Sequence, residues 1–386
     1  MKKPLTFLTV FDKMEKKKHS PFPKGERKDV SPMKQFNIAI IGQGRSGRDI
    51  HGLHLKKDTE RFRVVAVVEK LEKRMNRAAS EYGCDVYDDY TKLFERNDID
   101  LVVNSSPSHL HYAITKDLLS HGLNVLCEKP CVPTVEEFDD LCETAKANGC
   151  HFLVFQQSRF ANYFLKVKEV IASGVLGRIV HVGVQFNGYA RRWDWQCCLD
   201  FNGGNLANTG PHPVDQALNI LDAYDKELNI FCKMDRCNTF GNAEDYVKLI
   251  VTAPDRPLID LDISSCDAYP SYTYKVEGTC GTLKGTMAHL DWKYFKPEEA
   301  PEQKLIRTPL YVDEEQMPAY CGEKLTWYEE SWDGDPQAPF IAAVQTYYDQ
   351  IYELLLNGRE HDIKLYQVRQ QLDLIRKCHE MNPDIC

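Results

Sequence analysis

The strand and glycine turn at residues 36–47 constrain the fold of this chain more than any other segment. The run FNIAII (36–41) is typical of a parallel strand that is buried on both faces. GQGRSG (42–47) follows directly and precedes a helical pattern, which is the usual context of GxGxxG. Its glycines permit a tight turn, close approach of a pyrophosphate, and close packing of helix on strand. We expect a dinucleotide to contact Gly42, Gly44, Arg45, Ser46 and Gly47; a glycine turn without nucleotide is the alternative.

An acidic residue in the right place specifies the expected cofactor further. A second apolar run, RVVAVV (63–68), ends at Glu69, which follows the glycine turn by about 20 residues, as the dinucleotide-binding fingerprint requires. A carboxylate there can accept hydrogen bonds from both adenosine ribose hydroxyls and repels a 2′-phosphate. The sequence therefore favours NAD, while Lys70 and Arg74 keep NADP open as an alternative.

Strands and helices alternate through the first part of the chain. Apolar runs at 101–103, 124–127 and 151–155 are separated by helical patterns at 71–82, 112–120 and 135–148. This alternation indicates βαβ units and predicts an α/β Rossmann domain with a doubly wound parallel sheet.

The pattern changes after about residue 156. Residues 179–187, IVHVGVQFN, alternate between apolar and polar positions and predict an antiparallel strand with one buried face. Runs at 246–251 and 258–263 predict a hairpin, and 339–356 and 365–380 predict two helices. We expect a C-terminal α+β domain with a large, mainly antiparallel open sheet.

The distribution of charge and the change of pattern after about residue 156 predict three parts of the chain. The expected parts are a basic N-terminal extension (1–34), an NAD-binding Rossmann domain (35–156) and a substrate-binding and oligomerisation domain (157–386), whose last helices can pack back on the Rossmann domain. The extension has ten Lys/Arg and four Asp/Glu, although the whole chain has a formal net charge of −9. An acidic chain lacks the basic face that phosphate contacts need, so we expect no nucleic-acid partner.

Composition also bounds the compartment. The sequence has no run of 18 apolar residues, so no membrane span is expected. The short apolar run at 5–11 is followed by lysines without a cleavage site, which argues against secretion. The 14 cysteines include no CxxC pair, so we expect reduced thiols, no metal site and a cytoplasmic protein.

Two segments carry residues suited to proton and charge chemistry. CEKP (127–130) follows a predicted strand, so Lys129 lies at the carboxyl edge of the sheet, where it can stabilise alkoxide character on a substrate oxygen. Taken alone, an exposed charged turn explains this segment as well. GGNLANTGPHPVDQAL (203–218) contains His212 and Asp215. If Pro211 begins a helix, these two residues share one face, and Asp215 can orient the imidazole or hold the helix start.

Together, these segments resemble the Gfo/Idh/MocA oxidoreductases, which include glucose–fructose oxidoreductase and inositol dehydrogenases. The resemblance covers about residues 36–380 and rests on GQGRSG (42–47), SPSHLH (106–111), CEKP (127–130), GGNLANTGPHPVD (203–215) and EGTCGTL (277–283). It implies that Lys129 is the catalytic lysine and His212 the general base. It also implies cofactor contacts from Ser106, His111, Glu128 and Lys129. Family members usually have an aspartate four residues before the histidine; here Asn208 occupies that place and is expected to position substrate.

The segment YARRWDWQ (189–196) concentrates aromatic and charged side chains, which suit sugar rings and vicinal hydroxyls. A packed loop or subunit contact is the alternative. The predicted substrate contacts are Arg192, Trp193, Asp194, Trp195, Asn208 and Asp215. The resemblance implies an NAD-dependent dehydrogenase that oxidises a secondary hydroxyl of a sugar or glycoside, for example a glucoside to its 3-keto form. The alternatives are an inositol or polyol dehydrogenase and a non-catalytic NAD-binding sensor or scaffold. It further implies a homo-oligomer, a dimer or a tetramer.

Overall fold

The computed structural model describes residues 34–309, 312, 320–335 and 338–385. The described residues from Gln35 onward form one compact unit. The predicted basic extension therefore lies outside the described residues, apart from Lys34. The predicted boundary at residue 156 stays a prediction.

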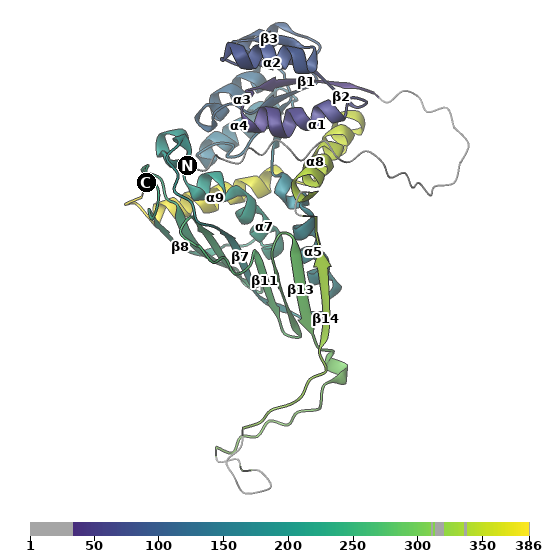
Figure 1. Ribbon diagram of the computed structural model, residues 1–386, viewed down its shortest axis with the longest axis vertical. Coiled ribbons are helices and arrows are strands. Elements are labelled where there is room, and N and C mark those ends of the chain that lie inside the picture. Colours follow the sequence, from purple (N-terminus) through teal and green to yellow (C-terminus); the bar gives the residue numbers. More distant parts are fainter. Residues whose placement is uncertain (1–33, 310–311, 313–319, 336–337, 386) are drawn as a thin grey trace, which may run out of the picture. The chain divides into compact units, whose positions relative to one another are not determined.

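A six-stranded parallel sheet forms the first part of this unit, as predicted (Figure 1). Its strands are β1 (Phe36–Ile41), β2 (Phe62–Val68), β3 (Asp85–Tyr87), β4 (Leu101–Asn104), β5 (Val125–Cys127) and β6 (Phe152–Val154). They lie in the order β3-β2-β1-β4-β5-β6, and β4, β5 and β6 are buried along their whole length. The strand order reverses between β1 and β4, which is where doubly wound sheets bind ligands at the carboxyl ends of their strands.

Helices connect these strands. They are η1 (Arg45–Gly52), α1 (Leu53–Lys57), α2 (Glu72–Tyr82), η2 (Tyr90–Glu95), η3 (Ser108–Leu110), α3 (His111–Ser120) and α4 (Val135–Ala147). The Thr134 side chain caps α4 by accepting a hydrogen bond of 3.1 Å from the Glu137 N–H, one of the donors that a helix start leaves unpaired. The helix after the glycine turn begins as a π-helix, a departure from α geometry that is frequent at functional sites.

The second part of the unit contains an eight-stranded sheet in the order β14-β13-β12-β11-β7-β10-β9-β8. Its strands are β7 (Ile179–Asn187), β8 (Asn229–Asp235), β9 (Tyr246–Thr252), β10 (Leu258–Ser264), β11 (Tyr274–Gly278), β12 (Gly281–Gly285), β13 (His289–Tyr294) and β14 (Tyr328–Asp333). β9 and β10 form the predicted hairpin, and most of the pairings are antiparallel.

The prediction for β7 was wrong in one respect. This strand pairs antiparallel with β11 but parallel with β10, because a long excursion of the chain separates β7 from β10. The register with β11 also shifts, with Glu277 opposite His181 and Gly278 opposite Ile179. Val180 is therefore an extra residue in the ladder, and such a bulge turns a side chain away from its expected face. This explains why Val180 is 46% exposed although Val182 and Val184 are buried.

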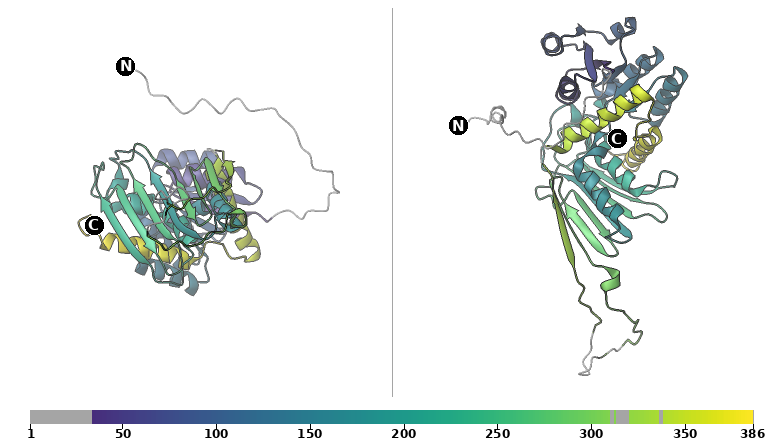
Figure 2. Two further views of the ribbon diagram at one scale, coloured as in Figure 1. Left: turned by 90° about the horizontal axis from the view of Figure 1, so that it is seen from below. Right: turned by 90° about the vertical axis from the view of Figure 1, so that its right-hand side faces the viewer.

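Helices cover one face of the large sheet (Figure 2). The elements outside the sheets in this part are η4 (Gln157–Phe160), α5 (Asn162–Ser173), η5 (Trp195–Cys197), η6 (Leu199–Phe201), α6 (Asn205–Asn208), α7 (Pro211–Leu221), η7 (Pro297–Glu299), α8 (Ala338–Asn357) and α9 (Leu365–Glu380). α7 and α9 contact the sheet, whereas α8 places Tyr347, Tyr348 and Ile351 in the core of the Rossmann domain. The chain thus returns to its first domain at its end.

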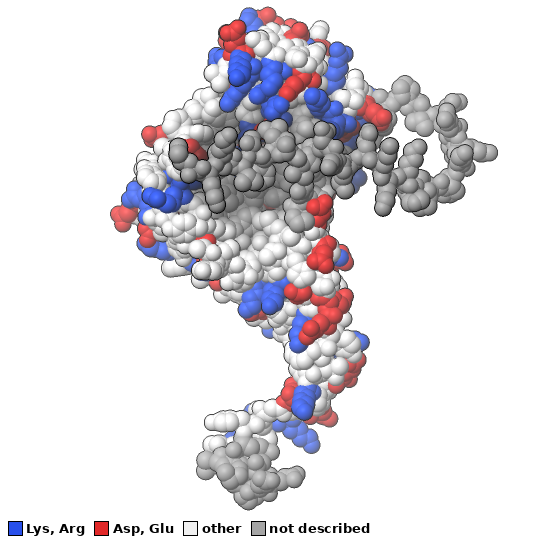
Figure 3. Space-filling view, in the orientation of Figure 1, with Lys and Arg blue, Asp and Glu red and all other residues white. Residues whose placement is uncertain are grey.

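The opposite face of the large sheet carries polar and charged side chains. Lys248 lies 3.1 Å from Asp262, and His181 lies 3.3 Å from Glu277. Charges of both signs are also mixed along the end of the sheet formed by β13 and β14 (Figure 3), where Lys293 pairs with Glu329 at 2.6 Å. Among the described residues, no helix is long and apolar enough to cross a membrane.

Candidate active site

The glycine turn has the shape that a pyrophosphate needs. Gly42 has φ of 89°, and a Cβ there would lie 2.5 Å from the Ser105 carbonyl oxygen. A Cβ on Gly47 would lie 2.0 Å from the Gly42 carbonyl oxygen. By contrast, a Cβ on Gly44 would meet no atom within 4 Å. The outer glycines are thus required by close packing of the backbone, while the middle one borders open space into which a ligand can enter.

Glu69 lies beside this turn at the end of β2. Its Oε2 accepts a hydrogen bond of 2.9 Å from the Gln43 N–H, and its Oε1 accepts one of 3.0 Å from the Leu71 N–H. Arg74 approaches to 3.5 Å. Each carboxylate oxygen can accept a second hydrogen bond, so capacity for ribose hydroxyls remains. The residues present therefore fit a dinucleotide.

Glu128 belongs to a buried network that the sequence did not reveal. Its Oε1 lies 3.1 Å from His51 Nε2, and its Oε2 accepts a hydrogen bond of 3.0 Å from the Lys129 N–H. His51 Nδ1 lies 2.8 Å from the Tyr348 hydroxyl. Burial raises the pKa of Glu128, but the hydrogen bond and charge of His51, together with the charge of Lys129, outweigh burial and lower it overall. The side chain is therefore an ionised, fixed neighbour of Lys129; its predicted cofactor contact stays a prediction.

Lys129 begins a cis peptide bond to Pro130 and points its amine at α6. Its Nζ donates a hydrogen bond of 2.8 Å to the backbone oxygen of Asn208. Burial lowers the pKa of Lys129; the nearby charges of Arg45 and Arg192 lower it further, and Glu128 opposes them. The structure thus joins the CEKP and GGNLANTGPHPVD segments through this amine.

His212 lies in the first turn of α7, as Pro211 at the helix start predicts. Its Nδ1 lies 3.1 Å from the Ser158 hydroxyl oxygen of η4. Burial lowers the pKa of His212 to about 3, and the positive charge of Lys129 adds to this effect. The imidazole is therefore neutral at neutral pH, which is the form that can accept a proton.

Asp215 is paired with an arginine and not with the imidazole. Its Oδ2 accepts a hydrogen bond of 2.9 Å from Arg159 Nε, and its Oδ1 accepts one from Arg159 Nη2. Both side chains are buried. The structure gives the imidazole a different partner, Ser158. The direct substrate contact predicted for Asp215 stays a prediction that this pairing does not favour.

Replacing Arg159 by methionine is expected to lower the free energy of unfolding by about 3–5 kcal/mol, because the Asp215 carboxylate is left buried without its partner. Urea denaturation measures this loss. The double variant Arg159→Met, Asp215→Leu serves as the control, since it removes both charges and is expected to recover most of the stability. Equal stability of wild type and Arg159→Met would contradict the importance of the pair.

The YARRWDWQ segment (189–196) contacts Asn208 through a hydrogen bond. The Gln196 Nε2 donates a hydrogen bond of 3.3 Å to Asn208 Oδ1, and the Arg192 guanidinium donates to Gln196 Oε1. Arg192 also pairs with Asp194 at 2.8 Å. The structure therefore brings three predicted substrate residues together, with Gln196 as a link that sequence reasoning missed.

The two tryptophans of this segment extend away from that chain of contacts. Trp193 is 80% exposed, and Trp195 packs edge-on against Phe201 with ring centroids 6.4 Å apart. Trp193 therefore presents a free aromatic face on the surface, and its predicted contact with substrate stays a prediction.

His111 ties two predicted cofactor segments together. Its Nδ1 lies 2.8 Å from the Pro130 carbonyl oxygen and its Nε2 lies 2.9 Å from the Ser106 carbonyl oxygen. Both nitrogens can donate only when the ring is protonated. Burial disfavours that form, but Cys127 and the two carbonyls outweigh it and raise the pKa of His111 to about 9. His111 is thus a fixed cation that holds the Ser106 loop against the Lys129–Pro130 turn.

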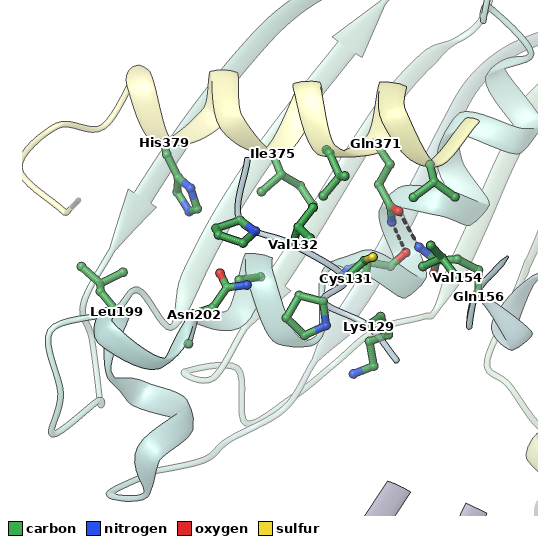
Figure 4. A pocket seen from close by; sticks show the side chains of 17 residues that line it. Lys129, Cys131, Val132, Val154, Gln156, Leu199, Asn202, Gln371, Ile375 and His379 are labelled. Atoms are coloured by element: carbon green, nitrogen blue, oxygen red, sulfur yellow. Dashed lines mark hydrogen bonds between the residues drawn. The ribbon is translucent and has the colours of Figure 1, made fainter. Parts of the chain in front are cut away.

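A pocket of about 260 Å³ lies on one side of the Lys129 turn (Figure 4). On α9, Ile375 points toward Val132, and Gln371 points toward Gln156, whose Nε2 donates a hydrogen bond to the Gln371 side-chain oxygen. Gln371 donates a hydrogen bond to the Pro211 carbonyl oxygen, directly before His212. This contact attaches α9 to the first residue of α7. The sequence does not reveal this contact, because Gln371 has the type and spacing of an ordinary helical residue.

Two models of protein-family domains match this chain. The model of an oxidoreductase family with an NAD-binding Rossmann fold, GFO_IDH_MocA, matches residues 36–156, and the model of the GFO/IDH/MocA C-terminal domain matches residues 164–284. The chain is 25% identical over 292 residues to the 2,7-anhydro-N-acetylneuraminate hydratase of Mediterraneibacter gnavus, covering 72% of this chain and 77% of the relative. It is 30% identical over 197 residues to the D-glucoside 3-dehydrogenase of Escherichia coli, covering 48% and 54%.

Solved structures share the fold. The WlbA dehydrogenase from Bordetella pertussis, in complex with NADH and UDP-GlcNAcA, superposes with a TM-score of 0.71 at 17% identity, covering 91% of this chain and 97% of that one.

Proposed function

Because the chain belongs to the GFO/IDH/MocA oxidoreductase family, whose first domain is an NAD-binding Rossmann fold, we propose that it oxidises a secondary hydroxyl of a sugar or glycoside with NAD. The leading case is a glucoside that is oxidised to its 3-keto form. The observation that carries the proposal is the meeting of Lys129 with the segment before His212, where the lysine amine lies 2.8 Å from the Asn208 backbone oxygen. A cation at Lys129 and a neutral imidazole at His212 support this proposal.

The glycine turn and Glu69 are proposed to bind the cofactor. η1 begins directly after Gly44, where a Cβ would meet no atom within 4 Å, and the unpaired N–H groups of a helix start suit a pyrophosphate. The Glu69 carboxylate suits the adenosine ribose hydroxyls. When bound, NAD supplies the acceptor for the hydride of the alcohol carbon.

Lys129 and His212 have different roles at the substrate hydroxyl. The Lys129 ammonium donates a hydrogen bond to the hydroxyl oxygen and stabilises its negative charge as the proton leaves. The neutral His212 imidazole accepts that proton. The alcohol thus loses one proton and one hydride and becomes a carbonyl. Asn208 and the Arg192–Gln196 pair are proposed to hold neighbouring hydroxyls.

Purified protein, incubated with NAD and a panel of glucosides, free sugars and inositols, tests this function. NADH absorbance and product analysis by mass spectrometry are both needed, because a tightly held cofactor that is recycled would hide turnover from absorbance alone. Oxidation of a glucoside, lost in the Lys129→Ala variant, is the expected result. Oxidation of inositols alone would replace the sugar substrate class, and NAD binding without any product would identify a non-catalytic protein.

The choice between NAD and NADP gives a separate prediction. Glu69→Gln keeps an acceptor oxygen for one of the two N–H groups, of Gln43 or Leu71, and removes the negative charge that repels a 2′-phosphate. We expect the preference for NAD over NADP, as the ratio of kcat/KM values, to fall about tenfold, which corresponds to about 1.4 kcal/mol. Glu72→Gln, three residues further on the exposed start of α2, is the matched control and is expected to leave the ratio unchanged. An unchanged ratio in Glu69→Gln would remove Glu69 from cofactor selection.

A further inference from the structure

A buried carboxylate that no sequence motif identified lies behind the candidate site. Glu244, two residues before β9, is 1% exposed. Its Oε1 accepts a hydrogen bond of 2.7 Å from the Leu206 N–H of α6. Its Oε2 has no hydrogen-bond partner among the described residues. A buried carboxyl group with a hydrogen bond to only one of its oxygens lowers the stability of the fold. The presence of Glu244 at this position therefore needs an explanation.

The start of α6 is shaped around this carboxylate. A Cβ on Gly204 would lie 2.3 Å from Glu244 Oε2, which is too close. Gly204 also has φ of 106°, a backbone conformation that residues with a side chain rarely adopt. The Asn205 N–H donates a hydrogen bond of 2.9 Å to the Glu244 carbonyl oxygen. The Asn205 side chain donates one of 2.8 Å to the Asp245 carbonyl oxygen. α6 is therefore attached to the residues before β9 along its first turn.

The other end of α6 carries the contact to Lys129. α6 spans only Asn205–Asn208, and the Asn208 N–H donates a hydrogen bond of 2.9 Å to the Gly204 carbonyl oxygen. The Asn208 carbonyl oxygen in turn accepts the hydrogen bond from Lys129. A helix of one turn has little stability of its own and takes its position from what it is attached to.

We propose that Glu244 is a positioning residue for Lys129, which holds α6 so that the Asn208 carbonyl oxygen receives the lysine amine. The inference rests on the proposed role of Lys129 in substrate oxidation. Glu244 acts through the acceptor oxygen that it offers to Leu206, not through its charge. The lysine is oriented by Asn208, and the carbonyl oxygen also stabilises the charged form of the amine.

The electrostatic surroundings support a role for the oxygen over the charge. Burial raises the pKa of Glu244 to about 7, with Asp245 adding to the effect, while the Leu206 N–H opposes it. The group is therefore only partly ionised near neutral pH. The charges that act on Lys129 are those of Glu128, Arg45 and Arg192, and Glu244 is not among them.

Two variants that break the attachment test the proposal. Glu244→Ala removes the acceptor, and Gly204→Ala pushes the carboxylate aside from the helix. Both are expected to lower kcat about tenfold, with KM for NAD unchanged. The limb of the pH profile that reports deprotonation of Lys129 is expected to move to lower pH, because the amine loses the carbonyl that stabilises its charge. Glu244→Gln keeps an acceptor oxygen of the same shape and is expected to retain both kcat and the position of the limb.

Amide hydrogen exchange of residues 204–209 provides a readout that does not depend on turnover. Exchange is expected to be faster in Glu244→Ala and unchanged in Glu244→Gln. Asp245→Ala is the matched control: the Asp245 side chain accepts hydrogen bonds from the Cys237 and Asn238 N–H groups, at 2.6 and 2.8 Å, and holds a different loop. This control is expected to leave exchange of residues 204–209 and the pH limb at their wild-type values.

The outcomes separate this inference from the proposed function. If Glu244→Ala unfolds at lower temperature but keeps the wild-type limb and exchange, or if Glu244→Gln behaves like Glu244→Ala, the positioning role is overturned. If the wild type oxidises no substrate, or Lys129→Ala retains turnover, the proposed function fails. In that case the hydrogen exchange still decides whether Glu244 holds α6.

Discussion

Lys129→Ala is expected to lower kcat about 10²- to 10³-fold, the usual cost of removing one preorganised donor from the oxygen that develops negative charge. The reason lies in the position of the amine, which is held by the Asn208 carbonyl oxygen at 2.8 Å beside a buried, ionised Glu128. KM for NAD is expected to change little, because the glycine turn and Glu69 are untouched. Steady-state kinetics on the oxidised glucoside, with NAD titrated separately, measure both quantities.

The pH profile adds a second signature of Lys129. The protonated amine is the active form, and burial lowers its pKa below the ordinary 10.5. Activity of the wild type is therefore expected to fall as the pH rises through that lowered pKa, and this alkaline limb is expected to vanish in Lys129→Ala. Lys129→Arg keeps the charge but not the compact ammonium, so it is not expected to restore turnover. Wild-type turnover in Lys129→Ala would contradict the assignment.

His212→Ala is expected to lower kcat about 10²- to 10⁴-fold, the range that a positioned general base contributes. Burial and the charge of Lys129 lower the pKa of His212 to about 3, so the base is already neutral at and around neutral pH. The acid limb that belongs to His212 is expected at low pH, with activity lost as the pH falls through that value. The profile between pH 5 and 8 is therefore expected to be flat with respect to this group.

Chemical rescue distinguishes proton transfer by His212 from a structural role. Added imidazole is expected to restore part of kcat in His212→Ala, in proportion to its neutral form, and to leave the wild type unchanged. Ser158→Ala removes the hydroxyl next to His212 Nδ1 and is the milder control. It is expected to lower kcat only a few-fold, because one neutral hydrogen bond contributes about 1 kcal/mol. A His212→Ala variant with normal turnover, or with no response to imidazole, would count against its role as the base.

The Rossmann domain could be predicted from the sequence because its signals are local. Each buried parallel strand is a short apolar run, and the glycine turn places its three glycines within six residues. Three strands of the large sheet, β7, β9 and β10, could also be predicted from the pattern of apolar residues. The parallel pairing of β7 with β10 was not, because hydrogen-bond partners that are distant in sequence leave no trace in the pattern of either strand.

The candidate site shows the same division. Lys129 and His212 could be named because the motifs around them, taken together, resemble those of a known family. Their supports could not: His51 and Tyr348 meet Glu128 from η1 and α8, and Gln371 meets Pro211 from α9. None of these residues differs in type or spacing from ordinary core or helix residues, so only folding reveals them.

The sequence by itself determined the α/β domain and the glycine turn, because these depend on residue types within a few positions of one another. The cofactor contact of Glu69 stays a prediction, and the roles of Lys129 and His212 stay predictions that rest on the family resemblance. Only the tertiary structure decided what surrounds them: that Asp215 pairs with Arg159, that the imidazole is neutral beside Lys129, and that Glu244 holds α6. The physical reason is that charge, burial and hydrogen-bond partners depend on distance in space, which folding sets between segments far apart in the chain.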